Sequence, residues 1–239
     1  IKRYLPFIDK ILITANKSQI FYLQEKEPLI GLKTIFAPLI VNIETFIPMG
    51  KFEARRVLGL PQDYFVILFV GALVFLKAPH ILIQAFKVFK MKYPKSLLVI
   101  IGKGPFNEGL LRMIEKLGLR ENVLLLGSIP HDNLPIYYNA ADVFVLPSFY
   151  EGLPLASLEA LSCGIPVVVT KAAGTGEFIE QGVEGFVVEE GNVEALAEAL
   201  IKALKLPPET RELCRRVALR FSQEEAGRFV KDILFSLLT

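Results

Sequence analysis

Two glutamates with seven residues between them stand where a predicted strand passes into a predicted helix. Glu151 follows an apolar run, and Glu159 lies in the next apolar stretch, which begins just after Pro154. Proline is favoured in the first turn of a helix, and the exposed N–H groups and positive dipole end of that turn attract phosphate. Two carboxylates nearby can accept hydrogen bonds from sugar hydroxyls. The segment therefore predicts a pocket for a sugar diphosphate.

A purely structural interpretation of the same pair remains open. Glu151 could simply cap the helix with its charge, and Glu159 could be one of the many carboxylates on a solvated surface. The residues around Glu159 favour the pocket instead, because Leu155, Leu158 and Leu161 leave that helix little polar face.

Glycine recurs directly after several other apolar runs of the chain. Ligands of open α/β sheets bind beyond the carboxyl ends of the strands, and glycine lets a backbone approach such a ligand closely. The segments that we expect at this edge are Gly71–Lys77, Gly102–Pro105, Gly127–Ile129, Pro147–Glu159 and Lys171–Glu177.

The elements that must position these segments alternate from Tyr64 onward. Short apolar runs are separated by stretches with helical periodicity, such as the one that contains Ile81, Ala85 and Phe89. The runs are Phe65–Val70, Leu97–Ile101, Val123–Leu126, Val143–Leu146, Val167–Val169 and Gly185–Val188. They are continuous rather than alternating, which is typical of strands covered on both faces. The pattern predicts an α/β fold with a Rossmann-like, doubly wound parallel sheet over residues 58–220.

Residues 1–57 predict the end of a preceding domain and a linker. The expected elements are a strand at Lys10–Ala15, a helix at Lys17–Leu23, an apolar run at Thr34–Val41 and the linker at Phe46–Leu60. They are too few to bury themselves and would expose apolar surface. Residues 221–239 hold an amphipathic helix at Glu224–Leu238, which either caps the core or returns to the preceding domain.

Composition and charge narrow the classes of function. Apolar residues make up 52% of the 239 residues, and the net charge of +2 includes no basic block of the kind that binds nucleic acid. Cys163 and Cys214 form no disulfide framework, so we expect a cytoplasmic protein. No apolar run reaches the ~20 residues of a membrane span, which leaves peripheral contact with the inner membrane face open.

Several polar and aromatic residues receive no part in the predicted pocket. His80 and His131 flank no cluster of cysteines or acidic residues, so we expect no metal site. Both histidines, together with Tyr138, are interpreted as structural. Asp132 predicts a helix N-cap.

The segment from Glu151 to Glu159 resembles the E-x7-E signature of GT-B glycosyltransferases, of the large family 4 or glycosyl transferases group 1 type. Other segments resemble that family's motifs in the same order along the chain. Ile101–Pro105 is similar to its G-x-G-P turn, Glu159–Val168 to E-A-x-A-x-G-x-P-V-V, Gly174–Glu177 to its G-x-x-E loop and Gly182–Val188 to G-x-x-G-x-L-V. The resemblance covers nearly all of residues 36–239 and points to the C-terminal, nucleotide-sugar-binding domain.

The resemblance implies roles for individual residues. Glu159 would hydrogen-bond the ribose of a nucleotide, and Glu151 would hold hydroxyls of the donor sugar at the reacting centre. Lys77, which could otherwise be an ordinary exposed lysine, would stabilise the charge that develops on the diphosphate. The other implied donor-binding residues are Gly71, Gly152, Leu153, Ser128 and Ile129.

The resemblance also implies a reaction, the retaining and metal-independent transfer of a sugar from a nucleotide-diphosphate sugar to an acceptor hydroxyl. No cofactor is implied. The acceptor, which could be a glycan, a lipid or a small molecule, would be bound by an N-terminal domain that is largely missing here, or by a partner chain.

Departures from the family pattern, together with the missing N-terminal strands, keep a second function open. Ala72 stands where the family has an arginine for the diphosphate, and Ala78 stands where it has a glycine. Lys103, or a residue supplied from elsewhere, is a candidate replacement for the arginine. Without a replacement, the chain would be a non-catalytic or degenerate nucleotide-sugar-binding module that acts with a partner chain. The order of the motifs disfavours an epimerase or a phosphorylase.

Overall fold

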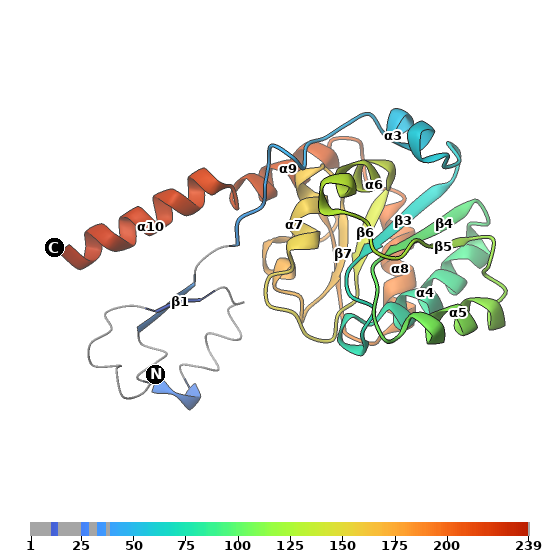
Figure 1. The fold of residues 1–239 in the computed structure, drawn as a ribbon, viewed down its shortest axis with the longest axis horizontal. Coiled ribbons are helices and arrows are strands. Elements are labelled where there is room, and N and C mark those ends of the chain that lie inside the picture. The colour runs from blue at the N-terminus through green and yellow to red at the C-terminus, as the bar shows by residue number, and fades with distance from the viewer. Residues whose placement is uncertain (1–10, 14–24, 29–32, 37–38, 239) are drawn as a thin grey trace.

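The computed structural model describes residues 11–13, 25–28, 33–36 and 39–238. Near the start of the chain, β1 (Ile11–Ile13) pairs in parallel with β2 (Thr34–Phe36). This pair confirms a strand within Lys10–Ala15, and the apolar run predicted from Thr34 begins with the second strand. The helix predicted at Lys17–Leu23 lies outside the described residues. Figure 1 shows the small β1–β2 sheet apart from the main sheet.

The main sheet has six strands in the order β5-β4-β3-β6-β7-β8, and every neighbouring pair is parallel. The strands are β3 (Phe65–Val70), β4 (Ser96–Ile101), β5 (Val123–Leu125), β6 (Val143–Leu146), β7 (Val167–Thr170) and β8 (Gly185–Val188). The chain runs outward from β3 to β5, returns to β6 beside β3, and then runs outward on the other side. This order is that of a Rossmann-like, doubly wound sheet, so the predicted fold class is confirmed.

The strands agree with the predicted apolar runs to within one residue at each end. Their sequences are continuous rather than alternating because helices cover both faces of the sheet. Every residue of β4 and of β6 is buried.

Helices form a layer on each side of the sheet (Figure 1). They are α4 (Pro79–Lys92), α5 (Asn107–Lys116), α6 (Leu134–Ala140), α7 (Leu155–Ser162), α8 (Val193–Ala203) and α9 (Thr210–Leu219). In one layer α4 packs against α5 and α8, and in the other α7 packs against α6 and α9.

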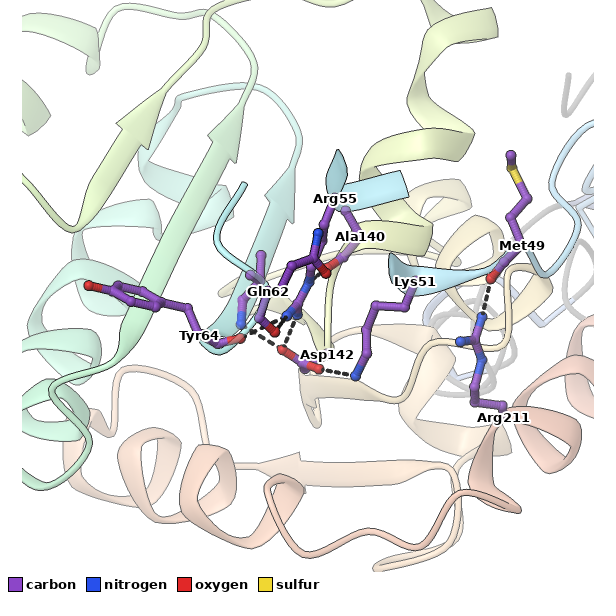
Figure 2. A network of polar contacts seen from close by, with 9 residues as sticks. Met49, Lys51, Arg55, Gln62, Tyr64, Ala140, Asp142 and Arg211 are labelled. Atoms are coloured by element: carbon purple, nitrogen blue, oxygen red, sulfur yellow. Dashed lines mark hydrogen bonds and ion pairs between the residues drawn. The ribbon is translucent and has the colours of Figure 1, made fainter. Parts of the chain in front are cut away.

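The segment predicted as a linker contains a helix, α3 (Lys51–Leu58), which packs on α6. Arg55 fixes this helix to the sheet domain, and Figure 2 shows its contacts. The buried guanidinium donates to the carbonyls of Ala140, Gln62 and Tyr64 and to the carboxylate of Asp142. Asp142 also accepts from the Val66 N–H and from Lys51. The linker prediction missed this helix, because the contacts that join it to the sheet domain, with Ala140 and Asp142, are distant along the chain.

The residues before α3 also dock on the sheet domain. The Phe46 side chain is fully buried, and its carbonyl accepts hydrogen bonds from Arg215 Nη1 and Ser162 Oγ, each at 2.6 Å. The Asn139 side chain, in turn, donates to the Ile47 carbonyl and accepts from the Met49 N–H. The chain therefore enters the sheet domain along a path that several side chains hold in place.

The last helix, α10 (Gln223–Leu238), confirms the predicted C-terminal helix. It starts beside the entering segment, where the Val41 N–H donates to the Phe221 carbonyl at 3.0 Å. From there it extends away from the main sheet (Figure 1), and Leu234 and Phe235 are exposed. Among the helices in the described part of the chain, none has the length and apolarity to cross a membrane.

Candidate active site

The carboxyl ends of β3 and β6 lie side by side, at the point where the strand order reverses. A ligand of a doubly wound sheet binds at such a point. Two of the predicted segments, Gly71–Lys77 and Pro147–Glu159, begin there. They are tied together by a hydrogen bond of 2.8 Å from the Phe149 N–H to the Leu76 carbonyl.

Lys77 and Glu151, one from each segment, form an ion pair. Their side chains are 24% and 20% exposed, so the pair is half-buried but open to solvent. Burial lowers the pKa of Lys77 below that of an ordinary lysine. The structure thus brings together the two residues predicted to act at the reacting centre, which are 74 residues apart in sequence.

Local backbone geometry places Lys77 at this edge. It ends a short 3-10 turn, η2 (Phe75–Lys77), and is followed by Ala78 with φ of +49°. Pro79 then begins α4. The left-handed conformation at Ala78 redirects the chain between the turn and the helix, and it explains why a glycine suits this position in the resembling family.

The start of α7 faces the same edge. The helix begins at Leu155, directly after its N-cap residue Pro154, whose side chain makes no capping hydrogen bond. The Glu151 carboxylate pairs with Lys77 and is not the N-cap of this helix. Within the described residues, the N–H groups of Gly152 and Leu153 donate no hydrogen bond. Their predicted use by a ligand stays a prediction, while the Leu153 side chain lies in the core.

Neighbouring backbone fixes the loop that carries these residues. The Glu151 N–H donates to the Ala172 carbonyl at 3.1 Å, and the Gly174 N–H donates to the Gly152 carbonyl at 2.7 Å. The loop after β6 is thus held by the loop after β7, so Gly152 and the start of α7 have a defined place.

Glu159 lies inside the domain, with only 3% of its surface exposed. Its carboxylate is held at both oxygens. His131 Nε2 lies 2.6 Å from Oε1, and Tyr138 Oη donates to Oε2 at 2.8 Å. The interpretation of Glu159 as a solvated surface residue is therefore wrong.

Interpreting His131 and Tyr138 as purely structural missed these contacts. His131 follows the predicted loop Gly127–Ile129 by two residues, and that position was the one available signal. The predicted N-cap at Asp132 is also wrong. A 3-10 turn (His131–Asn133) precedes α6, so Asn133 occupies the cap position.

The loops after β3, β4 and β5 lie against one another. The Gly102 N–H donates to the Gly127 carbonyl at 2.7 Å, and a Cβ at Gly102 would lie 1.8 Å from the Gly71 carbonyl oxygen. Glycine is thus required where these strand ends meet. In the loop that follows Gly127, Ser128 is exposed and Ile129 packs on the core. The structure brings the predicted positions Gly71, Ser128 and Ile129 to the same edge as Lys77.

Lys103 lies close to the position of Ala72. Both residues are exposed, and the Leu73 N–H donates to the Lys103 carbonyl at 3.1 Å. The structure therefore carries a second cation beside the loop after β3. Among the described residues, no group of three or more histidine, cysteine, aspartate or glutamate side chains is arranged to hold a metal ion.

A family model described as "Glycosyl transferases group 1" matches residues 50–220. Among curated relatives, the D-inositol 3-phosphate glycosyltransferase of Corynebacterium urealyticum is 35% identical over 211 residues, which are 83% of this chain and 50% of that protein. The protein of the same name from Mycobacterium leprae is 34% identical over 191 residues, covering 77% of this chain and 44% of that protein. This chain spans about half the length of these relatives.

Solved structures share the fold. Anabaena HepE in complex with UDP has a TM-score of 0.85 at 24% identity, covering 99% of this chain and 66% of that chain. The C-terminal domain of the glycosyl transferase group 1 family protein LpcC from Francisella tularensis has a TM-score of 0.64 at 26% identity, covering 74% and 92%. Since the family model covers most of the sheet domain and the curated relatives align with most of the chain, the chain belongs to the glycosyl transferases group 1 family.

Proposed function

We propose that this chain is the donor-binding half of a retaining glycosyltransferase, which moves a sugar from a nucleotide-diphosphate sugar to an acceptor hydroxyl. The observation that carries the proposal is the group of polar residues at the carboxyl ends of β3 and β6, where the strand order reverses. Lys77, Glu151 and the start of α7 lie at one edge of the sheet, and Glu159, farther along α7, contacts His131, which follows the loop after β5.

Lys77 and the start of α7 serve the leaving group in this proposal. Negative charge develops on the diphosphate as its bond to the sugar breaks. A positioned ammonium and free helix N–H groups stabilise that charge without reorganisation. Because these groups supply the positive charge, we expect the reaction to need no metal ion and no cofactor.

In this proposal Glu151 interacts first with Lys77 and then with the donor sugar. Before the nucleotide sugar binds, the Glu151 carboxylate neutralises the Lys77 ammonium. When the diphosphate arrives, Lys77 exchanges the carboxylate for phosphate oxygens, and Glu151 becomes available to the hydroxyls of the donor sugar. The ion pair thus keeps both half-buried charges compensated until the substrate replaces one partner.

Lys103 takes the place of the missing arginine beside Ala72. A lysine contacts phosphate as a point charge rather than through a two-pronged fork, so its contribution is less directional. Ala72 is also the observation that favours the second candidate, a degenerate nucleotide-sugar-binding module that acts with a partner chain.

The nucleotide and the acceptor follow from the relatives only as proposals. HepE was solved with UDP, and we propose a uridine nucleotide as the first donor to test. The acceptor hydroxyl, on a glycan, a lipid or a small molecule, would approach from the half of the relatives' length that this chain does not match, or from a partner chain.

Calorimetric titration with UDP, GDP and ADP, each with and without an attached sugar, tests the proposal. Lys77→Ala and Glu159→Ala should both weaken the binding of one diphosphate. Lys95→Ala is the matched control, because Lys95 is an exposed lysine paired with Asp63 away from this edge. The same titration in EDTA should give the same affinity. A folded protein that binds none of the three diphosphates would overturn the proposal, while binding without transfer to any acceptor by the full-length protein would favour the degenerate module.

A further inference from the structure

We propose that His131 and Tyr138 are positioning residues of the nucleotide site, which orient the Glu159 carboxylate, and that His131 also lies at the entrance through which a ribose reaches it. The inference rests on the proposed role of Glu159 as the ribose acceptor. It assigns a function to two residues that the sequence marks as structural.

The number of acceptor positions on the Glu159 carboxylate supports this role for His131 and Tyr138. An ionised carboxylate has two lone-pair positions on each oxygen. Tyr138 occupies one position on Oε2, and His131 occupies one on Oε1. No other group in the described part of the chain donates to this carboxylate, so one position remains on each oxygen, which matches the two adjacent hydroxyls of a ribose. The two protein donors leave the carboxylate no freedom to rotate, so it is oriented before a nucleotide binds.

Tyr138 is suited to be a permanent donor. Its side chain is fully buried, and burial, followed by the neighbouring Glu159 carboxylate, raises the pKa of the phenol well above its ordinary value. The hydroxyl therefore keeps its proton and can only donate to the carboxylate.

His131 occupies the outer side of the carboxylate. An ionised Glu159 can only accept, so Nε2 carries the hydrogen and the tautomer is fixed. The His131 side chain is 56% exposed, whereas that of Glu159 is 4% exposed. The exposed imidazole ring therefore lies on the solvent side of the buried carboxylate, where we expect a hydroxyl to approach.

Phe46, from the segment that enters the sheet domain, holds both donors. Its ring centroid lies 5.1 Å from that of His131 and 5.7 Å from that of Tyr138. Phe46 is itself fixed, because it is fully buried and its carbonyl accepts from Arg215 and Ser162. The orientation of Glu159 therefore depends on the residues just before α3 as well as on its own helix.

A matched pair of variants separates the hydrogen bond from the packing. His131→Gln keeps an N–H donor near the position of Nε2 but loses the ring. His131→Phe keeps a ring against Phe46 but loses the donor. Affinities for UDP and for 2′,3′-dideoxyuridine diphosphate are measured for each variant, and thermal unfolding checks that each is folded.

We expect the native protein to prefer UDP over the dideoxy compound. His131→Phe should lower the affinity for UDP by about tenfold, in line with the loss of a hydrogen bond to a charged group, and leave the dideoxy compound almost unaffected. His131→Gln should keep most of the preference. Tyr138→Phe, which also retains the ring, should reduce it as His131→Phe does.

Glu159→Ala distinguishes the two ways in which the idea can fail. If Glu159→Ala abolishes the preference and His131→Phe leaves it at the native value, the positioning role is wrong and the proposed ribose site survives. If Glu159→Ala leaves the preference intact, Glu159 is not the ribose acceptor, and the inference falls together with that part of the proposed function.

Discussion

Two cations sit at opposite edges of the same sheet and differ in how the protein satisfies them. Arg55 lies at the amino ends of β3 and β6, is 2% exposed, and donates to three carbonyls and to Asp142. Lys77 lies at the carboxyl ends of these strands and is 24% exposed. In the described part of the chain, its ammonium donates to the Glu151 carboxylate and to no other group.

The difference separates a cation that stabilises the fold from one that is suited to bind a ligand. A buried charge is tolerated when each of its polar atoms is hydrogen-bonded, as all three guanidinium nitrogens of Arg55 are, and removing one partner leaves the rest uncompensated. A cation that must bind phosphate needs donors that a substrate can reach. The sheet therefore has a guanidinium with all three nitrogens hydrogen-bonded at the amino ends of its strands, and an ammonium that can exchange its partner at the carboxyl ends.

Replacing Arg55 tests whether its hydrogen-bond network stabilises the fold. Arg55→Met removes four hydrogen bonds and leaves the Asp142 carboxylate with Lys51 and the Val66 N–H. We expect the free energy of unfolding to fall by about 3–5 kcal/mol. Urea unfolding followed by circular dichroism measures the change.

Two controls accompany this variant. Arg55→Lys keeps the charge but not the fork, so its loss of stability should be smaller, and it provides a folded protein if Arg55→Met does not fold. The affinity of the folded fraction for nucleotide should stay at the native value. A stability loss below about 1 kcal/mol, which is typical of exposed ion pairs, would show that the network at α3 does not hold the helix.

Lys77→Met is the counterpart at the other edge. Because the ion pair is open to solvent, we expect the free energy of unfolding to change by less than about 1 kcal/mol. The affinity for a nucleoside diphosphate should fall roughly 10- to 100-fold, the equivalent of one charge-assisted hydrogen bond. Affinity for the nucleoside, which has no phosphate, should not change. An equal loss for nucleoside and diphosphate would remove Lys77 from the phosphate site.

The lowered pKa of Lys77 gives binding and stability opposite dependences on pH. The protonated lysine attracts phosphate, so affinity is full below the pKa of Lys77 in the folded protein and is lost as pH rises through it. Between that pKa and about 10.4, the ordinary lysine value, the unfolded chain binds more protons, so this residue's contribution makes stability rise with pH. Calorimetry and urea unfolding over a pH series measure the two effects. In Lys77→Arg the fall in affinity should move to higher pH, and an unchanged profile would assign the titration to another group.

Burial of the strands on both faces of the sheet explains why their bounds could be predicted from the sequence. Val143–Leu146 and Gly185–Val188 are strands with the predicted bounds, because a parallel strand between two helix layers must be apolar throughout. Lys77 and Glu151 could be assigned to one site because the carboxyl ends of neighbouring strands share an edge. The contacts between side chains that are distant along the chain could not be predicted. Arg55 and Asp142 are 87 residues apart, and His131 and Glu159 are 28 residues apart.

Local geometry accounts for the remaining errors. The predicted N-cap at Asp132 failed because a 3-10 turn shifts the start of α6 to Leu134. The linker prediction missed α3, whose position depends on Arg55 rather than on a long apolar face. The first error is thus one of local turn geometry, whereas the second depends on contacts with Ala140 and Asp142, which are distant along the chain.

The smallest expected effect concerns the backbone that presents Lys77. Ala78 is fully buried and has φ of +49°, a left-handed conformation that costs an alanine roughly 1–2 kcal/mol but not a glycine. Ala78→Gly relieves that strain, while the more flexible unfolded chain offsets part of the gain. We expect the free energy of unfolding to rise by about 0.5 kcal/mol, with nucleotide affinity unchanged because Lys77 is kept.

Ala197→Gly in α8 is the matched control, since Ala197 is also buried and the same substitution inside a regular helix should lower stability by about 0.5–1 kcal/mol. Opposite signs for the two variants would confirm that strain is stored next to Lys77, at the ligand edge, and not in the helices around it. If both variants lose stability equally, Ala78 is unstrained in solution, and the two edges of the sheet differ in the partners of their cations but not in the strain of their backbone.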